Sequence, residues 1–349
     1  MQPNERGSHP GMSSSINVGV IGYGYWGPNL VRNFVASEGT RVTVVADRDR
    51  ERLAKVHAFY PAIKLTTSAD ELINDPEVDA VVVATPVDAH FPLAMAALKA
   101  GKHVFVEKPI ASTAEQARQL IDEAARRGLI LAVDHTFVYT AAVRKMHEII
   151  RSDAFGKTRY YDSTRVNLGL FQHDVNVLWD LAVHDLSIMH YILDGSPVAV
   201  SATGHSHRPG QPEYAAFLTV FMDDGTIAHI NVNWLSPVKI RRTLVGGERQ
   251  MIVYDDLETS EKIKLYDKGI VVNETPEDVH KLLISYRTGD LWSPNLPATE
   301  ALAVEAEHFA ACINGEQTPI TGGEAGLEIV RILEAADQSM RGNGAPVNL

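Results

Sequence analysis

The stretch GVIGYGYWGPNLVRNF (Gly19–Phe34) carries the local signals that decide the fold. It continues an apolar strand pattern and then places Gly22, Gly24 and Gly27 before a helical pattern. In this setting the first glycine permits a tight turn, the second lets the backbone approach a pyrophosphate, and the third lets helix and strand pack closely. Free N–H groups at the start of the helix can then bind phosphate oxygens. The stretch predicts a dinucleotide-binding turn, with a ligand-free tight turn as the alternative.

An acidic residue stands downstream, where such a turn requires one. Asp47 closes the next predicted strand, RVTVVA, and its carboxylate can accept hydrogen bonds from the adenosine ribose hydroxyls. A carboxylate here repels a 2′-phosphate, which favours NAD over NADP. Arg48 beside it is expected to stack on adenine or to meet a 2′-phosphate, with a solvated charge as the alternative. Tyr25 and Trp26 in the glycine loop are predicted cofactor contacts, and packing of Trp26 against a second domain is the alternative.

Composition limits the class of protein. A chain of 349 residues with 45% hydrophobic residues predicts two domains of ordinary size. The net charge of −12 disfavours nucleic acid and anionic membrane as partners, so we expect a small-molecule partner. Cys312 is the only cysteine, which excludes an internal disulfide and a cysteine metal cluster and fits a reducing cytoplasm. No metal site is predicted, and the polar residues 1–15 are expected to be a disordered leader or a cloning remnant.

The pattern from Ile16 to Val133 alternates short apolar strands with helical segments. The strands that we predict are INVGVI, RVTVVA, DAVVVAT, KHVFVEK and LILAVD. Near-continuous apolar strands separated by helices indicate a parallel sheet that is covered on both faces. The first half is therefore predicted to be a doubly wound α/β domain.

The pattern changes after about Thr136. A predicted helix at Ala141–Ile150 is followed by a long alternating strand, a helical stretch and further alternating strands, which indicate an open, mainly antiparallel sheet with one helix packed on it. Its other face is expected to form a homodimer or homotetramer interface. The boundaries that we predict are 16–137 for the dinucleotide-binding domain, 138–296 for a substrate and oligomerisation domain, and 297–349 for helices that strap the two together.

Two short motifs carry chemistry. EKP (Glu107–Pro109) closes the strand KHVFVEK, so Lys108 is directed to the carboxyl edge of the sheet, where its ammonium can stabilise a substrate oxyanion. In WDLAVHDL the i,i+4 spacing of a helix places Asp180 beside His184, so that the carboxylate can orient the imidazole. A histidine near its intrinsic pKa can take the proton of an alcohol. A surface lysine and an ordinary helix-surface pair are the alternatives.

Together the glycine loop, Asp47, Thr85-Pro86 with His90, AGKHVFVEKP and Asp180-x-x-x-His184 resemble the glucose-fructose oxidoreductase, inositol dehydrogenase and rhizopine-catabolism oxidoreductase family. The resemblance covers nearly the whole chain from Ile16, including EAEHFAACINGEQTPITGGEAGLEIVRILEAA near its end. It implies an N-terminal Rossmann domain, a C-terminal α/β domain with an open antiparallel sheet, and a nicotinamide cofactor between them.

The resemblance also implies roles by position. Lys108 and His184 correspond to the family's catalytic lysine and histidine, and Asp180 is their acidic companion. The cofactor contacts that it implies near the nicotinamide are Thr85, Pro86, His90, Glu107 and Lys108. Val87 departs from the pattern, since many members have Asn there, which puts one polar cofactor contact in doubt.

Two stretches, 165–193 and 285–313, look most like the branch that oxidises nucleotide-activated amino sugars at C3, of the UDP-N-acetylglucosamine 3-dehydrogenase kind. Arg165 and Asn167 would then contact the sugar or its carboxylate, with sheet-surface polarity as the alternative. Further pocket candidates, each with packing as the alternative, are Tyr139, His135, Asn176 and Trp179.

The resulting hypothesis is an NAD-dependent oxidoreductase that acts on a hydroxyl or ketone of a sugar, with a nucleotide-linked sugar as the expected substrate. An inositol or free-sugar dehydrogenase is the nearest alternative. A glycosidase that oxidises its substrate transiently with bound NAD, and a dinucleotide-sensing regulator without catalysis, are the two alternatives from other classes.

Overall fold

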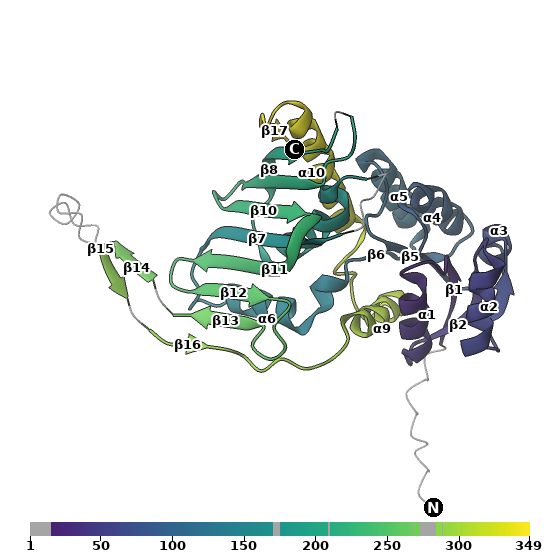
Figure 1. The fold of residues 1–349 in the computed structure, drawn as a ribbon. Coiled ribbons are helices and arrows are strands. Elements are labelled where there is room, and N and C mark those ends of the chain that lie inside the picture. Colours follow the sequence, from purple (N-terminus) through teal and green to yellow (C-terminus); the bar gives the residue numbers. More distant parts are fainter. Residues whose placement is uncertain (1–14, 170–174, 209, 268, 273–283, 288) are drawn as a thin grey trace, which may run out of the picture.

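The computed structural model describes residues 15–169, 175–208, 210–267, 269–272, 284–287 and 289–349. Within them, six parallel strands form one sheet in the order β3-β2-β1-β4-β5-β6 (Figure 1). The order of the strands reverses between β1 and β4, which makes the carboxyl ends of these two strands the ligand-binding crevice of such a sheet. The strands are β1 Ile16–Ile21, β2 Thr40–Ala46, β3 Lys64–Thr66, β4 Ala80–Val83, β5 His103–Glu107 and β6 Leu131–Asp134.

The predicted doubly wound domain is confirmed, and β3 is an addition to it. This strand spans only Lys64–Thr66 and is not fully buried, so it lacks the apolar run that identifies the others. The strand pairs β1 with β2 and β1 with β4 are parallel, as alternation with helices predicts.

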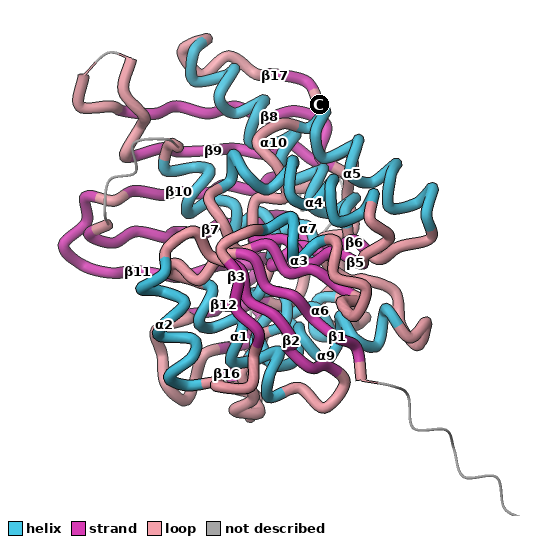
Figure 2. Tube along the Cα trace, turned by 90° about the vertical axis from the view of Figure 1, so that its right-hand side faces the viewer, coloured by secondary structure: helices cyan, strands magenta, loops and turns pink. Residues whose placement is uncertain are grey.

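Helices cover both faces of this sheet (Figure 2). One core joins the strands to α1 and α2, together with α9 from the end of the chain, and the other joins them to α3, α4 and α5. Local chemistry sets the limits of α5, because Thr113 caps its start through the backbone N–H of Gln116 and Gly128 ends it with a φ of 66°. The helices are α1 Gly27–Ala36, α2 Arg50–Phe59, α3 Ala69–Ile73, α4 His90–Lys99 and α5 Ala114–Arg127.

A second sheet follows, with nine strands in the order β16-β13-β12-β11-β7-β10-β9-β8-β17 among the described residues. Most neighbours are antiparallel, as predicted, but β7 and β10 are parallel. The strands are β7 Thr158–Leu168, β8 Pro197–His205, β9 Ala215–Met222, β10 Ile227–Asn233, β11 Leu235–Gly247, β12 Met251–Asp255, β13 Ile263–Tyr266, β16 Leu291–Trp292 and β17 Val347–Asn348. A separate hairpin of β14 Gly269–Val272 and β15 Ile284–Arg287 projects from the body (Figure 1).

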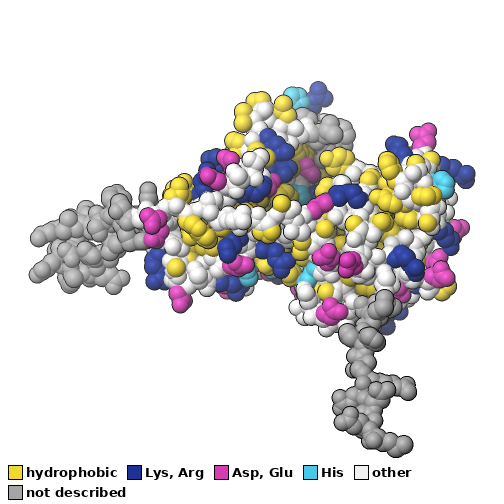
Figure 3. Space-filling view, turned by 90° about the horizontal axis from the view of Figure 1, so that it is seen from below, with side chains coloured by type: hydrophobic (Ala, Val, Ile, Leu, Met, Phe, Trp, Pro, Cys, Tyr) yellow, Lys and Arg dark blue, Asp and Glu magenta, His cyan; other side chains and the backbone are white. Residues whose placement is uncertain are grey.

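One face of the second sheet is buried and the other is open. Alternate residues of β9 and β10 pack against α6 (Ala141–Ile150), α7 (Val183–Ile192) and α10 (Gly323–Arg341). The open face exposes half of the Phe217 side chain and more than half of Val238 and Leu168. The underside of the molecule carries intermixed positive and negative side chains rather than a field of one sign (Figure 3).

The last two helices join the halves. Helix α9 (Ala301–Ile313) packs on α1, while α10 contacts both α5 and β8. Phe309 of α9 makes edge contacts with Phe34 and Phe105, so the C-terminal segment completes a core of the first sheet. In the part of the chain that the structure describes, no helix is long and apolar enough to cross a membrane.

Candidate active site

Two of the three glycines in the loop lie where a side chain would clash with the backbone, and the third lies where it would not. Gly22 has a φ of +100°, and a Cβ there would lie 2.3 Å from the Ala84 oxygen. A Cβ on Gly27 would lie 2.3 Å from the Gly22 oxygen. A Cβ on Gly24 would meet nothing nearer than a nitrogen of Arg52 at 3.5 Å. Gly24 therefore leaves the loop open to a ligand above the start of α1, where Pro28 stands in the first turn.

Asp47 lies beside this loop and helps to shape it. Its Oδ2 accepts a hydrogen bond from the Tyr23 N–H at 2.7 Å, and its Oδ1 accepts one from the Asp49 N–H at 2.8 Å. The Arg52 Nη1 lies 3.6 Å from the Asp47 Oδ2 and forms an ion pair that was not predicted, although its place in the first turn of α2 could have indicated it. Arg48 is exposed at the same wall. This end of the site therefore combines the carboxylates of Asp47 and Asp49 with the guanidinium groups of Arg48 and Arg52.

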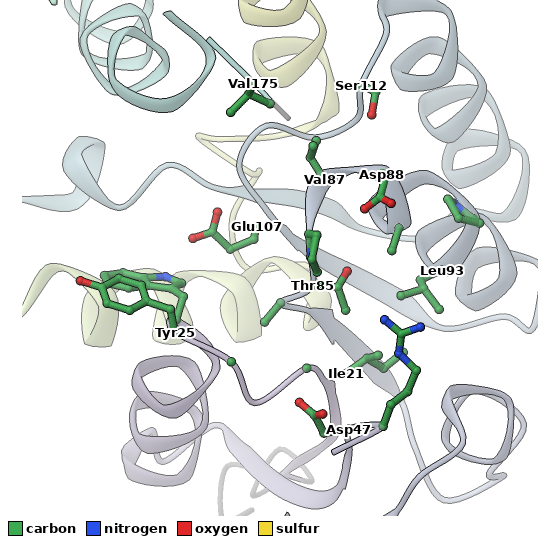
Figure 4. Close-up of a pocket in the computed structure, with 18 of the residues that line it drawn as sticks. Ile21, Tyr25, Asp47, Thr85, Val87, Asp88, Leu93, Glu107, Ser112 and Val175 are labelled. Carbon is green, nitrogen blue, oxygen red and sulfur yellow. The ribbon is translucent and has the colours of Figure 1, made fainter. Parts of the chain in front are cut away.

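A cavity of about 1400 Å³ runs from this loop to the second half of the chain. Figure 4 shows Asp47 near one end, Thr85 and Glu107 in the middle, and Val175 near the other end. Drug-sized ligand pockets measure roughly 300–1,000 Å³, so this cavity has room for a dinucleotide and a further molecule. The predicted site residues that line this cavity are Gly22, Gly24, Tyr25, Trp26, Asp47, Arg48, Thr85, Pro86, Glu107, Asn176 and Trp179.

The predicted contacts at the end of β4 separate into two kinds. Thr85 lines the cavity, and its Oγ1 is buried without a hydrogen-bond partner among the described residues. His90 was predicted as a cofactor contact, and this is corrected: it is 1% exposed and does not line the cavity. Its two ring nitrogens lie 2.8 Å from the carbonyl oxygens of Pro109 and Thr85. His90 instead ties the segment after β5 to the segment after β4.

Lys108 reaches the second half of the chain. Its Nζ donates a hydrogen bond to the backbone oxygen of Asp180 at 3.2 Å and lies 3.9 Å from the Asp180 Oδ1. Glu107 beside it lines the cavity with only part of its surface exposed, and burial, with the nearby Asp134 carboxylate, raises the pKa of Glu107 to about 8. Asp134 accepts a hydrogen bond from Trp26 Nε1 at 2.7 Å, so Trp26 spans from the glycine loop to the end of β6.

The predicted pairing of Asp180 with His184 is corrected. Leu178–Ala182 forms a π-helical turn before α7 rather than a continuous α-helix, so the assumed i,i+4 geometry does not hold. The Asp180 Oδ2 accepts from Trp234 Nε1 at 2.9 Å, while His184 Nδ1 is buried without a hydrogen-bond partner in the described parts of the chain. The acidic group thus accompanies Lys108 and not His184.

His184 lies in an apolar and positively charged environment. Its ring centroid is 5.0 Å from that of Phe137. Burial first, and then the charges of Lys108 and Arg165, hold the pKa of His184 well below its usual range. These surroundings favour the neutral form of the imidazole.

Arg165 and Tyr139 are corrected as direct substrate contacts. The Arg165 side chain is buried, its Nε donates to Asp185 at 2.7 Å, and its guanidinium carbon lies 4.4 Å from the centre of the Phe137 ring. Tyr139 is 3% exposed and its hydroxyl is 3.1 Å from that of Thr321. Both side chains are packed into protein rather than presented to the cavity.

Two of the other substrate candidates share one partner. Asn176 Nδ2 donates to Asp337 at 2.7 Å, and Trp179 Nε1 donates to the other oxygen of Asp337 at 2.9 Å. Asn167 is partly buried on β7, and His135 is buried, with both ring nitrogens unpartnered among the described residues. Asp337 was missed because no local motif surrounds it near the end of the chain.

Comparison with known proteins gives matches over most of the chain. Residues 16–135 match the family model described as "Oxidoreductase family, NAD-binding Rossmann fold", and residues 143–253 match the "GFO/IDH/MocA C-terminal domain". The Uncharacterized oxidoreductase YdgJ of Escherichia coli is 30% identical over 72% of this chain and 74% of its own length. The scyllo-inositol 2-dehydrogenase (NAD(+)) of Bacillus subtilis is 25% identical over 97% of each chain.

The UDP-N-acetylglucosamine 3-dehydrogenase of Acidithiobacillus ferrooxidans is similar in sequence and in structure. Its sequence is 28% identical over 93% of this chain and 96% of its own length. Its solved structure superposes with a TM-score of 0.78 at 26% identity, covering 94% of this chain and 99% of that one.

Proposed function

Because this chain belongs to the GFO/IDH/MocA family of NAD-binding oxidoreductases, we propose that it transfers hydride between NAD and a hydroxyl-bearing carbon of a nucleotide-linked amino sugar. The observation that carries the proposal is the contact of Lys108 with Asp180 and its nearness to His184. Lys108 and Asp180 directly follow Glu107 and Trp179, which line a cavity large enough for both molecules. The near full-length similarity to a UDP-N-acetylglucosamine 3-dehydrogenase supports the substrate class.

The residues present fit NAD. Gly24 leaves the loop open, and Asp47 lies where the adenosine ribose is expected. Thr85, whose buried Oγ1 has no hydrogen-bond partner among the described residues, lines the middle of the cavity. The bound nicotinamide would supply the hydride acceptor. We infer a preference for NAD over NADP, because the carboxylates of Asp47 and Asp49 oppose a 2′-phosphate at this end of the cavity, while Arg52 is already ion-paired with both of them.

The chain's own residues divide the remaining work. The neutral His184 takes the proton of the substrate hydroxyl as hydride leaves the carbon. The Lys108 ammonium donates a hydrogen bond to the oxygen on which negative charge develops. Asp180 positions Lys108 through its backbone oxygen. In the reverse direction the same two side chains return the proton and stabilise the same oxygen.

A substrate panel tests this proposal. We expect NADH formation with UDP-N-acetylglucosamine or a related UDP-sugar, and loss of at least about a hundredfold in kcat for Lys108→Ala and His184→Ala. Circular dichroism of both variants controls for folding. Turnover of inositols without turnover of UDP-sugars would instead assign the inositol dehydrogenase reaction, which the Bacillus subtilis relative makes the second candidate. Release of an aglycone without net NADH would assign glycoside cleavage, and NAD binding with no turnover of any class would assign a sensor.

We also propose a homodimer or homotetramer formed through the open face of the second sheet, where Phe217, Val238 and Leu168 are exposed. The proposal also places domain boundaries near residues 137 and 296. It includes a location in the reducing cytoplasm, which is inferred from the single cysteine. Multi-angle light scattering of the wild type and of Phe217→Lys tests the interface, and an unchanged mass in the variant would contradict it.

A further inference from the structure

Asp337 of α10 accepts two hydrogen bonds from residues at a turn that is distant from it in sequence. Its Oδ1 accepts from Asn176 Nδ2 at 2.7 Å and its Oδ2 accepts from Trp179 Nε1 at 2.9 Å. Hydrogen bonds to an ionised carboxylate are shorter and stronger than those between neutral groups. One carboxylate therefore holds both a side chain just before the π-helical turn Leu178–Ala182 and a side chain within it.

The same turn is capped from its start. The Asn176 Oδ1 accepts from the backbone N–H of Leu178 at 3.0 Å and of Trp179 at 3.4 Å, while its Nδ2 is held by Asp337. Both the oxygen and the nitrogen of the Asn176 side-chain amide are therefore hydrogen-bonded. Because π-helical turns are rare and occur mostly as single turns at functional sites, the contacts that hold this one bear on the site.

The turn then presents Asp180 to Lys108. The Asp180 backbone oxygen accepts from Lys108 Nζ at 3.2 Å, and its Oδ2 accepts from Trp234 Nε1 at 2.9 Å. Trp179, the preceding residue, packs against the hydrophobic cores of both halves of the molecule. A displacement of the turn therefore moves the acceptor that holds the Lys108 ammonium.

We propose that Asp337 is a positioning residue that, through Asn176 and Trp179, fixes the π-helical turn whose Asp180 oxygen holds Lys108 in place. The inference rests on the proposed function, in which Lys108 stabilises the substrate oxygen. It adds a residue of the C-terminal helix to the machinery of the site.

The variants are Asp337→Ala, which removes both acceptors, and Asp337→Asn, which keeps one. Gln338→Ala is the matched control, since Gln338 is the exposed next residue of the same helix. The chain has four tryptophans, so the indole N–H resonances in a ¹⁵N spectrum can be assigned with Trp179→Phe and Trp234→Phe. Asp337→Ala is expected to shift the resonances of both Trp179 and Trp234, and Gln338→Ala to shift neither.

Lys108 supplies a second readout that needs no substrate. Its rate of acetylation as a function of pH, followed by mass spectrometry, is expected to rise several-fold in Asp337→Ala, because Nζ loses its fixed acceptor. In turnover, a misplaced Lys108 is expected to lower kcat by roughly ten- to a hundredfold while the Kd for NAD stays within about twofold. Asp337→Asn is expected to fall between the wild type and Asp337→Ala, and it serves as the test variant if Asp337→Ala does not fold.

Two results would overturn the proposal. One is an unchanged Trp234 resonance with unchanged Lys108 acetylation. The other is a weakened Kd for NAD with unchanged kcat, which would make Asp337 a direct cofactor contact. If the wild type turns over no sugar, the proposed function fails, but the resonances and the acetylation rates still decide the role of Asp337.

Discussion

Replacing Gly24 by alanine separates ligand binding from folding within one loop. The nearest atom to a Cβ at this position is Arg52 Nη1 at 3.5 Å, which is an ordinary van der Waals distance. We therefore expect the free energy of unfolding without ligand to change by less than about 0.5 kcal/mol. The added methyl group would instead stand where the pyrophosphate must approach the backbone.

The expected loss follows from the hydrogen bonds that the loop would offer. A backbone hydrogen bond to a charged phosphate contributes about 1.5–3 kcal/mol, so losing one weakens the Kd for NAD by roughly ten- to a hundredfold. Isothermal titration with NAD measures this change, and urea unfolding in the absence of NAD measures stability. An unchanged Kd in Gly24→Ala would refute the assignment of this loop as the pyrophosphate site.

Gly22→Ala is the matched comparison. Gly22 has a φ of +100° and an alanine Cβ would lie 2.3 Å from the Ala84 oxygen. Both effects act on the folded chain itself, so this variant is expected to lose about 1–3 kcal/mol or more of stability without NAD. A Gly22→Ala variant as stable as the wild type would contradict the loop geometry described above.

Three further predictions address single side chains. Asp47→Ala should weaken NAD binding and bring the Kd values for NAD and NADP closer together, as titration with both would show; tighter NADP binding by the unsubstituted protein would contradict the role of Asp47. Burial and the neighbouring cations hold the pKa of His184 below its usual range, so kcat/KM should stay high as the pH falls below about 6.5. The contribution of His184 to the free energy of unfolding should decline in the same pH range, because the unfolded chain binds a proton there that the folded chain does not. A pH profile of kcat/KM that loses activity already above pH ~6.5 would refute this. Arg165→Met should cost about 3–5 kcal/mol in urea unfolding by leaving the buried Asp185 unpaired, with recovery in Arg165→Met/Asp185→Asn, and a loss below about 1 kcal/mol would show that the pair is not coupled to folding.

Much of the site was accessible from local sequence. Local sequence predicts Gly22, Gly27 and Asp47, because a turn, a close backbone approach and a strand end impose requirements that few residue types meet. Lys108 was placed correctly at the carboxyl edge because the parallel sheet directs every strand end to the same side. Its role in catalysis stays a prediction.

The predictions that were wrong concern side-chain partners that the local sequence does not specify. The spacing of Asp180 and His184 was interpreted with α-helical geometry, but a π-helical turn moved the carboxylate toward Trp234 and Lys108. His90 and Arg165 have the residue types expected of a ligand site, yet their partners are the oxygens of Pro109 and Asp185. Whether a polar side chain meets a ligand or a distant part of its own chain is not encoded by its neighbours in sequence.

By itself the sequence determined the class of this protein: a strand, a glycine loop and a helix, an acid at the end of the next strand, and alternating patterns that form a parallel and then a mainly antiparallel sheet. These are local requirements, set by backbone sterics and by the burial of one face of each element. Only the tertiary structure decided which polar groups from distant parts of the chain meet, such as Asp337 with Trp179 and Lys108 with Asp180. Those contacts depend on how the returning helix and the two sheets pack, because packing brings together residues that are far apart along the chain.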